Sequence, residues 1–389
     1  MNNDFTFQKM LTCIGNKRKL IGKIEGIITK NIIPRLNKNT AKIRFDFNEN
    51  NDHIKLSIDL SNKATIFDGF AGSSVVSRSL SQFADIIHTN DLELYSSTMA
   101  RCFLNKPTDT MKKKIKNHID QMNIIAKNGP YYEGIITKNY SPKDTNNIKI
   151  GERCFYTHEN ALIIDTLRKY IDDHVEEELF DYCITPLLIK SSIHANTAGV
   201  FKGFYKDKKT HIGKFGGSKN DDNKRITLPI HLELPIWSNY DFNANIYNKD
   251  INILIDELPN NIDITYLDPP YNQHPYSSNY FMLNLIINNK QPNDISDVAG
   301  IPNNWTRSDY NYKKKAIIAM KDLIQKTMKK SKYILLSYNN EGIIPLDEWD
   351  NIFQGYSVEE FKINYDAYKG SRNLKDRSNK VIEIMYLIY

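Results

Sequence analysis

The stretch Asp268-Pro269-Pro270-Tyr271 places an acid, two prolines and an aromatic ring directly after the apolar run "IDITYL". Proline has no N–H to give to a sheet, and it forces the residue before it away from helical angles. The chain therefore leaves the predicted strand as a rigid extended arm. Such an arm fixes two hydrogen-bond acceptors, the Asp268 carboxylate and the Pro269 carbonyl, beside the ring of Tyr271. This arrangement fits a planar group that bears an NH2.

Three further acids follow predicted strands and precede predicted helices. Asp68 opens the turn "DGFAGSS", whose glycines let the backbone approach a ligand at a helix N-terminus. Asp91 follows roughly 20 residues later, where an acid can accept hydrogen bonds from both ribose hydroxyls. Asp250 begins the helix "INILIDEL". The plainer alternatives are an ordinary turn for Asp68 and helix caps for Asp91, Glu93 or Asp250, but coincidence at three strand ends favours a binding site.

The order of the elements predicts an α/β protein with a doubly wound sheet. Strand and helix patterns alternate over residues 64–104 and again from about 244 onward. The last two segments, "EEFKINYDAY" and "NKVIEIMYLIY", predict an antiparallel hairpin that closes the sheet edge. Ligands of such sheets bind beyond the carboxyl ends of the strands, so the four turns are expected to meet at one site.

Two segments interrupt this pattern. Residues 43–58 alternate across a polar turn and predict a hairpin, to which we assign no function. From about 105 to 195 the pattern is typical of helices with charged faces, and a Gly- and Lys-rich stretch at 197–225 then predicts an exposed hairpin or loop. We therefore expect a discontinuous catalytic domain, residues 1–104 and 241–389, with an inserted, mostly helical domain at 105–240.

Composition limits the class of protein. The chain has 389 residues, is 40% hydrophobic, and carries 52 Lys and Arg against 46 Asp and Glu, for a net charge of +6. This excess permits a polyanionic partner without proving one. The four cysteines are scattered with no CxxC pair, which favours free thiols over disulfides or a metal site. No apolar run approaches the roughly 20 residues of a membrane helix, and we expect a soluble, cytoplasmic protein.

These motifs resemble those of amino-methyltransferases that use S-adenosylmethionine, and their order resembles the Dam-type (D12 class, α group) DNA adenine-N6 methyltransferases. In that family a "GxKxxL" helix precedes an "FxGxG" turn, an acid, a target-recognition insertion and finally DPPY. This chain has "GNKRKL" at 15–20, "DGFAGSS" at 68–74 and DPPY at 268–271. The resemblance covers both flanks of the chain, and DPPY is its only highly specific motif. It implies a Rossmann-like methyltransferase sheet that acts on duplex DNA.

The resemblance also implies roles for single residues. Lys17 and the glycine turn would surround the methionine end of the cofactor, Asp91 its ribose, and Asp250 with Ile251 its adenine. The full implied cofactor set is Gly15, Lys17, Asp68, Phe70, Ala71, Gly72, Asp91, Asp250, Ile251 and Asp268. The catalytic corner that holds a flipped adenine would be Asp268, Pro269, Pro270 and Tyr271. One departure is Ser74, which replaces the second glycine of the usual turn and would narrow the backbone approach if it faced the ligand.

The insertion would then read the DNA sequence. Its segment "NTAGVF" loosely resembles the Asn-x-x-Gly-x-Phe hairpin of the Dam-type recognition region, which makes His194, Asn196 and Phe201 candidate base readers. Phosphate contacts would come from Lys202, Lys206, Lys208, Lys209 and Lys214. The plainer interpretation of these lysines is a solvated loop.

Alternatives from other classes stay open at this point. Enzymes that modify ribosomal RNA amino groups carry a similar turn, but they seldom place a long insertion ahead of it. Protein-glutamine methyltransferases usually start the turn with Asn. An inactive nucleic-acid-binding subunit could keep the same fold, and Ser74 leaves that option open. The sequence does not identify the methylated site, a partner restriction endonuclease, or whether the protein is a monomer or a weak dimer.

Overall fold

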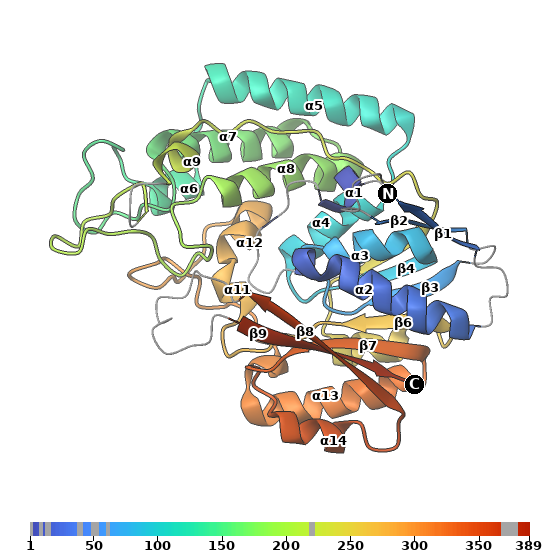
Figure 1. Cartoon of the computed structure of the whole chain (residues 1–389). Helices are drawn as coiled ribbons and strands as arrows, with labels where there is room; N and C mark the ends of the chain where they lie inside the picture. The colour runs from blue at the N-terminus through green and yellow to red at the C-terminus, as the bar shows by residue number, and fades with distance from the viewer. Residues whose placement is uncertain are drawn as a thin grey trace.

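A seven-stranded sheet forms the centre of the molecule, with helices on both faces (Figure 1). The computed structural model describes residues 3–7, 11, 17–36, 42–47, 54–59, 63–217, 222–366 and 380–389. The strand order is β5-β4-β3-β6-β7-β9-β8. The strands are β3 (Ala64–Asp68), β4 (Ala84–Asn90), β5 (Asn243–Tyr247), β6 (Ile262–Leu267), β7 (Ser331–Asn339), β8 (Val358–Asp366) and β9 (Lys380–Ile388).

The first five strands in this order run parallel, whereas β9 is antiparallel to both β7 and β8. The predicted α/β class and the predicted C-terminal hairpin are therefore confirmed. Every residue of the central strand β6 is buried, as expected for a parallel strand covered on both faces.

Successive side chains of one strand pack into different hydrophobic cores, because they point to opposite faces of the sheet. Ile66 of β3 packs with α2 (Ile21–Ile27) and α3 (Val75–Leu80). Phe67, the next residue, packs on the opposite face with α10 (Ile251–Glu257), α13 (Lys313–Met328) and α14 (Trp349–Ile352). The predicted helix near Lys17 is present as the 3-10 turn η1 (Lys17–Leu20), which leads into α2.

The predicted hairpin at 43–58 is also confirmed. Strands β1 (Lys42–Phe47) and β2 (Ile54–Asp59) pair antiparallel, with Ile43 opposite Ile58 and Phe45 opposite Leu56. Further short elements complete the chain: α1 (Asn3–Phe7), η2 (Ile28–Ile32), η3 (Ile33–Leu36), η4 (Ser81–Phe83), η5 (Glu177–Leu179), η6 (Asp309–Asn311) and η7 (Leu346–Glu348).

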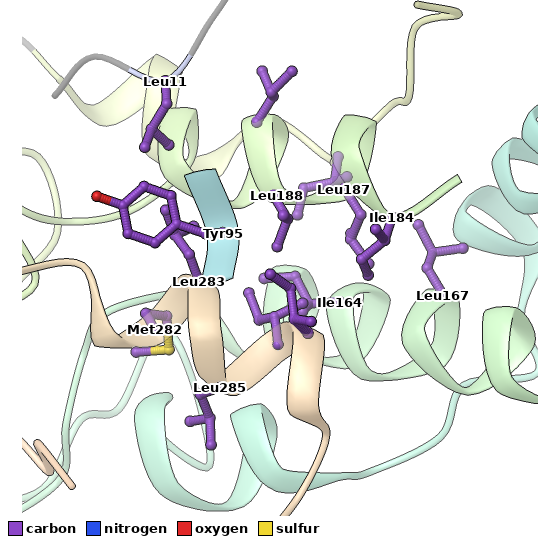
Figure 2. Close-up of a cluster of buried hydrophobic side chains, with 14 of the residues drawn as sticks. Leu11, Tyr95, Ile164, Leu167, Ile184, Leu187, Leu188, Met282, Leu283 and Leu285 are labelled. Atoms are coloured by element: carbon purple, nitrogen blue, oxygen red, sulfur yellow. The ribbon is translucent and has the colours of Figure 1, made fainter. Parts of the chain in front are cut away.

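The regular elements described between α4 (Leu94–Leu104) and β5 are helices. The longer ones are α5 (Asp109–Asn128), α6 (Ile135–Tyr140), α7 (His158–His174), α8 (Phe180–Ile193) and α9 (Asn223–Thr227). They do not close a core alone, because α4 and α12 (Phe281–Asn288) pack into the same cluster. Figure 2 shows Met282, Leu283 and Leu285 of α12 in one cluster with Ile164 of α7 and Leu188 of α8.

Two sets of hydrogen bonds tie this helical segment to the chain that follows DPPY. Arg168 of α7 donates to the carbonyls of Ile286 and Ile287 at 2.7 and 2.9 Å. The Phe201 N–H donates to the carbonyl of Asn279, in α11 (Tyr276–Asn279), at 2.7 Å. The inserted segment is therefore anchored close to the turn predicted to do chemistry.

Cys102, Cys154 and Cys183 are buried free thiols, as predicted, and Cys13 lies outside the described residues. Within the described part of the chain, no helix combines the length and apolar character needed to cross a membrane.

Candidate active site

One pocket lies beyond the carboxyl ends of β3, β4 and β6, where three of the four predicted turns meet. It brings together these members of the predicted set: Lys17, Phe70, Ala71, Gly72, Asp91, Asp268 and Pro270. The glycine turn and the acid of DPPY thus share a single cavity. The pocket also includes side chains that the sequence did not single out as ligand contacts: Ser73, Val75, Val76, Leu92, Glu93, Tyr95, Pro275, Tyr276, Thr306, Ser308 and Asn311. Gly15 lies outside the described residues.

The glycine turn is held in place by backbone hydrogen bonds. The Gly69 N–H donates to the Tyr266 carbonyl at 3.0 Å, and the Ala71 N–H donates to the Asn90 carbonyl at 2.9 Å. A Cβ on Gly69 would come within 2.4 Å of the Ile251 Cδ1, so a larger residue there would displace the Ile251 side chain. This close packing fixes the turn against both neighbouring strands.

Asp91 also stabilises the glycine turn through a hydrogen bond. Its carboxylate accepts from the Gly72 N–H at 2.7 Å and from the Glu93 N–H at 2.8 Å, and burial raises its pKa. Burial, and then the charge of Asp91, raises the pKa of Glu93 to about 8. Neither acid has the side-chain contact of a cap on α4, so the plainer alternative for Asp91 and Glu93 is not observed. Both face the pocket and offer acceptors there.

Three predicted cofactor residues do not line the pocket. Asp68 is 0% exposed beneath the turn, accepts from the Ser77 hydroxyl at 2.6 Å, and has a pKa raised by burial to about 7. Asp250 accepts from the Asn252 N–H as the N-cap of α10, and Ile251 is buried in the sheet core. Because Asp68 is buried beneath the turn, the expectation that it contacts the cofactor is corrected. Asp250 forms the helix cap that was the plainer alternative for it.

Ser74 adopts the left-handed conformation that the motif glycine would supply, with φ at 60°. It is 0% exposed and does not line the pocket. Its hydroxyl has no hydrogen-bond partner among the described residues. The Ser74 side chain therefore does not narrow the pocket. Serine in place of glycine at this position affects the stability of the fold instead.

The catalytic corner carries a buried ion cluster. Lys17 Nζ lies 2.7 Å from Asp268 Oδ1 and 3.0 Å from Glu383 Oε1, and the three side chains are 5%, 16% and 1% exposed. Glu383 in β9 also accepts from the Ser337 hydroxyl. A buried charge without a partner is costly, so each member of the cluster depends on the others.

The charges in this cluster shift its pKa values in opposing ways. Burial alone would lower the pKa of Lys17, but the Asp268 and Glu383 carboxylates outweigh it and raise that pKa well above its usual value. Burial raises the pKa of Asp268 to about 6, with Lys17 opposing the rise and Glu383 adding to it. At neutral pH Asp268 is therefore an anion and Lys17 a cation.

Tyr271 stands next to this cluster. Its ring centroid lies 5.9 Å from Lys17 Nζ, and its carbonyl accepts from the Ile343 N–H at 2.9 Å. Pro269 is buried and Pro270 contributes to the pocket wall. The corner thus combines an anion, a fixed backbone and an aromatic ring.

The candidate base readers of the insertion are buried. Asn196 is 0% exposed and donates to the carbonyls of Cys154 and Lys214, both at 2.9 Å. Phe201 is 2% exposed in the aromatic core, and His194 is buried as well. Because these side chains do not reach the surface, the expectation of base contacts is corrected to a role in shaping the segment.

The predicted phosphate-binding lysines differ from the lysines of α5 in their ion pairing. Lys202, Lys206, Lys208 and Lys209 are exposed and Lys214 is half-buried, and within the described residues none of the five forms an ion pair. In α5, by contrast, Lys112, Lys114 and Lys116 pair with Asp109, Glu176 and Asp120. Among the described residues, no carboxylate therefore lies at ion-pair distance from these five lysines.

Comparison with known proteins identifies the class of this site. Residues 51–352 match the family described as D12 class N6 adenine-specific DNA methyltransferase. The chain belongs to this family. The predicted D12 resemblance is thus confirmed, and the pocket of this D12 methyltransferase contains both the glycine turn and the DPPY acid.

Three relatives are named as modification enzymes. The modification methylase StsI of Streptococcus sanguinis is 29% identical over 344 residues, which cover 82% of this chain and 47% of that protein. The type II methyltransferases M.NlaIII of Neisseria lactamica and M.CviAII of Paramecium bursaria Chlorella virus 1 are 26% and 24% identical. Their matches cover 82% and 83% of this chain and 89% of each relative. The chain thus spans about half the length of the first relative and most of the other two.

The backbone of Ser74 leads to a stability prediction. A non-glycine residue in the left-handed region costs about 1–2 kcal/mol, and glycine loses roughly 0.5–1 kcal/mol more entropy on folding. Ser74→Gly should therefore raise the free energy of unfolding by about 0.5–1 kcal/mol, measured by urea denaturation. Ser74→Ala keeps the backbone conformation and serves as the matched control for loss of the hydroxyl. A Ser74→Gly protein less stable than the wild type would contradict this account.

Proposed function

We propose that this D12 methyltransferase transfers a methyl group from S-adenosylmethionine to the N6 atom of an adenine flipped out of duplex DNA. The observation that carries the proposal is the single pocket shared by the glycine turn and Asp268. The family match supports an enzyme that acts on DNA over one that acts on ribosomal RNA or protein glutamine, and over an inactive nucleic-acid-binding subunit. The names of the relatives support a further proposal, that the enzyme protects DNA from a partner restriction endonuclease.

The chemistry of the pocket fits S-adenosylmethionine. The Asp91 carboxylate offers an acceptor for ribose hydroxyls, and Phe70, Tyr95 and Tyr276 offer apolar and aromatic surface. When bound, S-adenosylmethionine supplies an electrophilic methyl group on a positively charged sulfur. The anionic Asp268 at the end of the same pocket suits that charge. Lys17, Ala71 and Gly72 would surround the remainder of the ligand.

The amino nitrogen of adenine is a weak nucleophile because the ring delocalises its lone pair. The Asp268 carboxylate and the Pro269 carbonyl would each accept one N–H of this amine and draw the nitrogen toward tetrahedral geometry. The Asp268 charge would stabilise the positive charge that develops on nitrogen, and Asp268 can take the released proton. Lys17 fixes the position of Asp268 through their ion pair.

Flipping an adenine out of the duplex costs a few kcal/mol. Stacking on the ring of Tyr271 would return about 1–3 kcal/mol. Phosphate contacts would supply the remainder, and the unpaired lysines of the 202–214 segment are suited to provide them. We propose the helical segment 105–240 as the recognition domain, with the catalytic domain formed by residues 1–104 and 241–389.

Substitution of Asp268 tests the catalytic assignment. Asp268→Ala should lower methyl transfer at least about 10²–10³-fold, because one of the two acceptors and the stabilising anion are lost. Binding of S-adenosylmethionine should change far less. The measurement is transfer of labelled methyl groups to duplex DNA, with single-stranded RNA and protein as parallel substrates. Turnover near that of the wild type would refute the role of Asp268.

The pH dependence tests the charge cluster. Because Asp268 acts as an anion, kcat/KM should fall as the pH drops through about 6. The charged and titratable groups that interact with Asp268 are Lys17, Glu383, Asp68, Tyr266, Tyr271 and Tyr276. Glu383→Gln removes a negative charge that raises the pKa of Asp268, so the acidic limb should move to lower pH.

Ser337→Ala is the matched control for this shift. It removes the hydrogen bond to Glu383 but keeps the charge, so the acidic limb should stay in place. An unchanged limb in Glu383→Gln, with reduced stability alone, would mean that Glu383 only supports the fold.

The insertion lysines can be tested against those of α5. Lys208→Ala and Lys209→Ala should each reduce the slope of log K for duplex DNA against log salt by about 1, because each lysine releases counterions from a phosphate. Lys112→Ala and Lys116→Ala form the control pair, since carboxylates already compensate those charges. Equal slopes for both pairs would remove the segment from the DNA interface.

A further inference from the structure

A second cationic surface lies in the proposed catalytic domain, in the segment that leads into α13. We name it the Trp305 patch and define it as Trp305, Arg307, Tyr312, Lys313 and Lys314. No part of it belongs to the DPPY corner, the glycine turn or the insertion.

Alternate residues of this segment line the pocket. Thr306 and Ser308 line the pocket, whereas Trp305 and Arg307, the residues between and before them, do not. The Thr306 N–H donates to the Ser277 hydroxyl at 3.1 Å, which fixes the segment to the chain that follows DPPY. The patch therefore stands at the rim of the pocket that contains Asp268.

The Arg307 guanidinium is held in a defined orientation. It lies 4.1 Å from the ring centroid of Trp305 and 5.9 Å from that of Tyr312, and it donates to the Tyr312 hydroxyl at 2.8 Å. Arg307 itself is exposed, and no carboxylate in the described part of the chain pairs with it. A flat guanidinium fixed by stacking is well suited to bidentate contact with a phosphate.

The surrounding charge has the same sign. Lys313 and Lys314 are exposed and form no ion pair with a described residue. The single acid between 305 and 315 is Asp309, and Lys315 neutralises it at 2.9 Å. Lysines in the first turn of a helix oppose its dipole, so stability of α13 does not explain their position. Among the described residues, the segment thus carries three cations, Arg307, Lys313 and Lys314, that no carboxylate pairs with.

We propose that the Trp305 patch binds the phosphate backbone of the duplex next to the flipped adenine. This inference rests on the proposed function and adds a contact surface that the catalytic domain itself supplies. Arg307 and the two lysines contact phosphates, while Trp305 and Tyr312 keep the guanidinium in place. The duplex is then held from the catalytic side as well as by the lysines of the insertion.

The test is the salt dependence of binding to a short duplex, which carries a sequence methylated by the wild-type enzyme or, if the enzyme methylates none, a mixed sequence that contains adenine. Arg307→Ala should weaken binding roughly tenfold and reduce the slope of log K against log salt by about 1. Arg307→Lys keeps the charge but not the bidentate geometry, so the slope should stay while part of the affinity is lost. Lys326→Ala is the matched control on α13, because Lys326 already pairs with Asp256 and Asp322.

Fluorescence gives a second readout. The chain has three tryptophans, of which Trp349 is buried and Trp237 and Trp305 are half-buried. Addition of the duplex should change the emission of the wild type, and Trp305→Phe should remove most of this change. An emission change that persists in Trp305→Phe would place the contact elsewhere.

The outcomes separate this proposal from the proposed function. Wild-type affinity and slope in Arg307→Ala, with methyl transfer intact, would overturn the patch alone. Loss of S-adenosylmethionine affinity with unchanged duplex binding would also overturn it and assign Arg307 to the cofactor. If the wild type transfers no methyl group to DNA but its duplex binding depends on Arg307, the patch stands and the proposed function fails.

Discussion

The buried pairing of Lys17 with Asp268 and Glu383 is the constraint on which the rest of the site depends. It joins the 3-10 turn η1, the corner after β6 and the strand β9. Loss of one partner from such a cluster costs about 3–5 kcal/mol, because a charge is left buried and uncompensated. The same pairing keeps Asp268 in one position and leaves it anionic at neutral pH. Fold stability and the acceptor needed for chemistry are therefore supplied by one set of contacts.

The helical insertion is coupled to this corner through the chain that follows DPPY. α12 packs inside the core of the insertion, and Arg168 and Phe201 bond to backbone atoms of 279–287. A change in the insertion on contact with DNA would reach the corner through these contacts. The core of the proposed recognition domain thus includes α12, a helix from the proposed catalytic domain. A boundary at 240–241 therefore divides the sequence into two segments but cuts through one shared hydrophobic core.

Local patterns predicted the strands, the turns and the meeting of three of the four turns at one pocket, because periodicity and proline or glycine chemistry act over a few residues. Contacts between distant segments were not predictable in this way. Glu383 looks like one polar residue in an apolar strand, and its partner Lys17 lies near the other end of the chain. Asn196 and Phe201 sit in a glycine-rich stretch that indicates exposure, yet the insertion core encloses both. Asp68 resembles a ligand residue by position, but the tight turn covers it.

A crystal structure with duplex DNA and a non-reactive analogue of the methyl donor tests the central claim most directly. The account predicts an extruded adenine whose N6 atom lies within hydrogen-bond distance of both the Asp268 carboxylate and the Pro269 carbonyl, with Lys17 still paired to Asp268. An adenine that remains stacked in the duplex, or one whose N6 contacts neither acceptor, would contradict it.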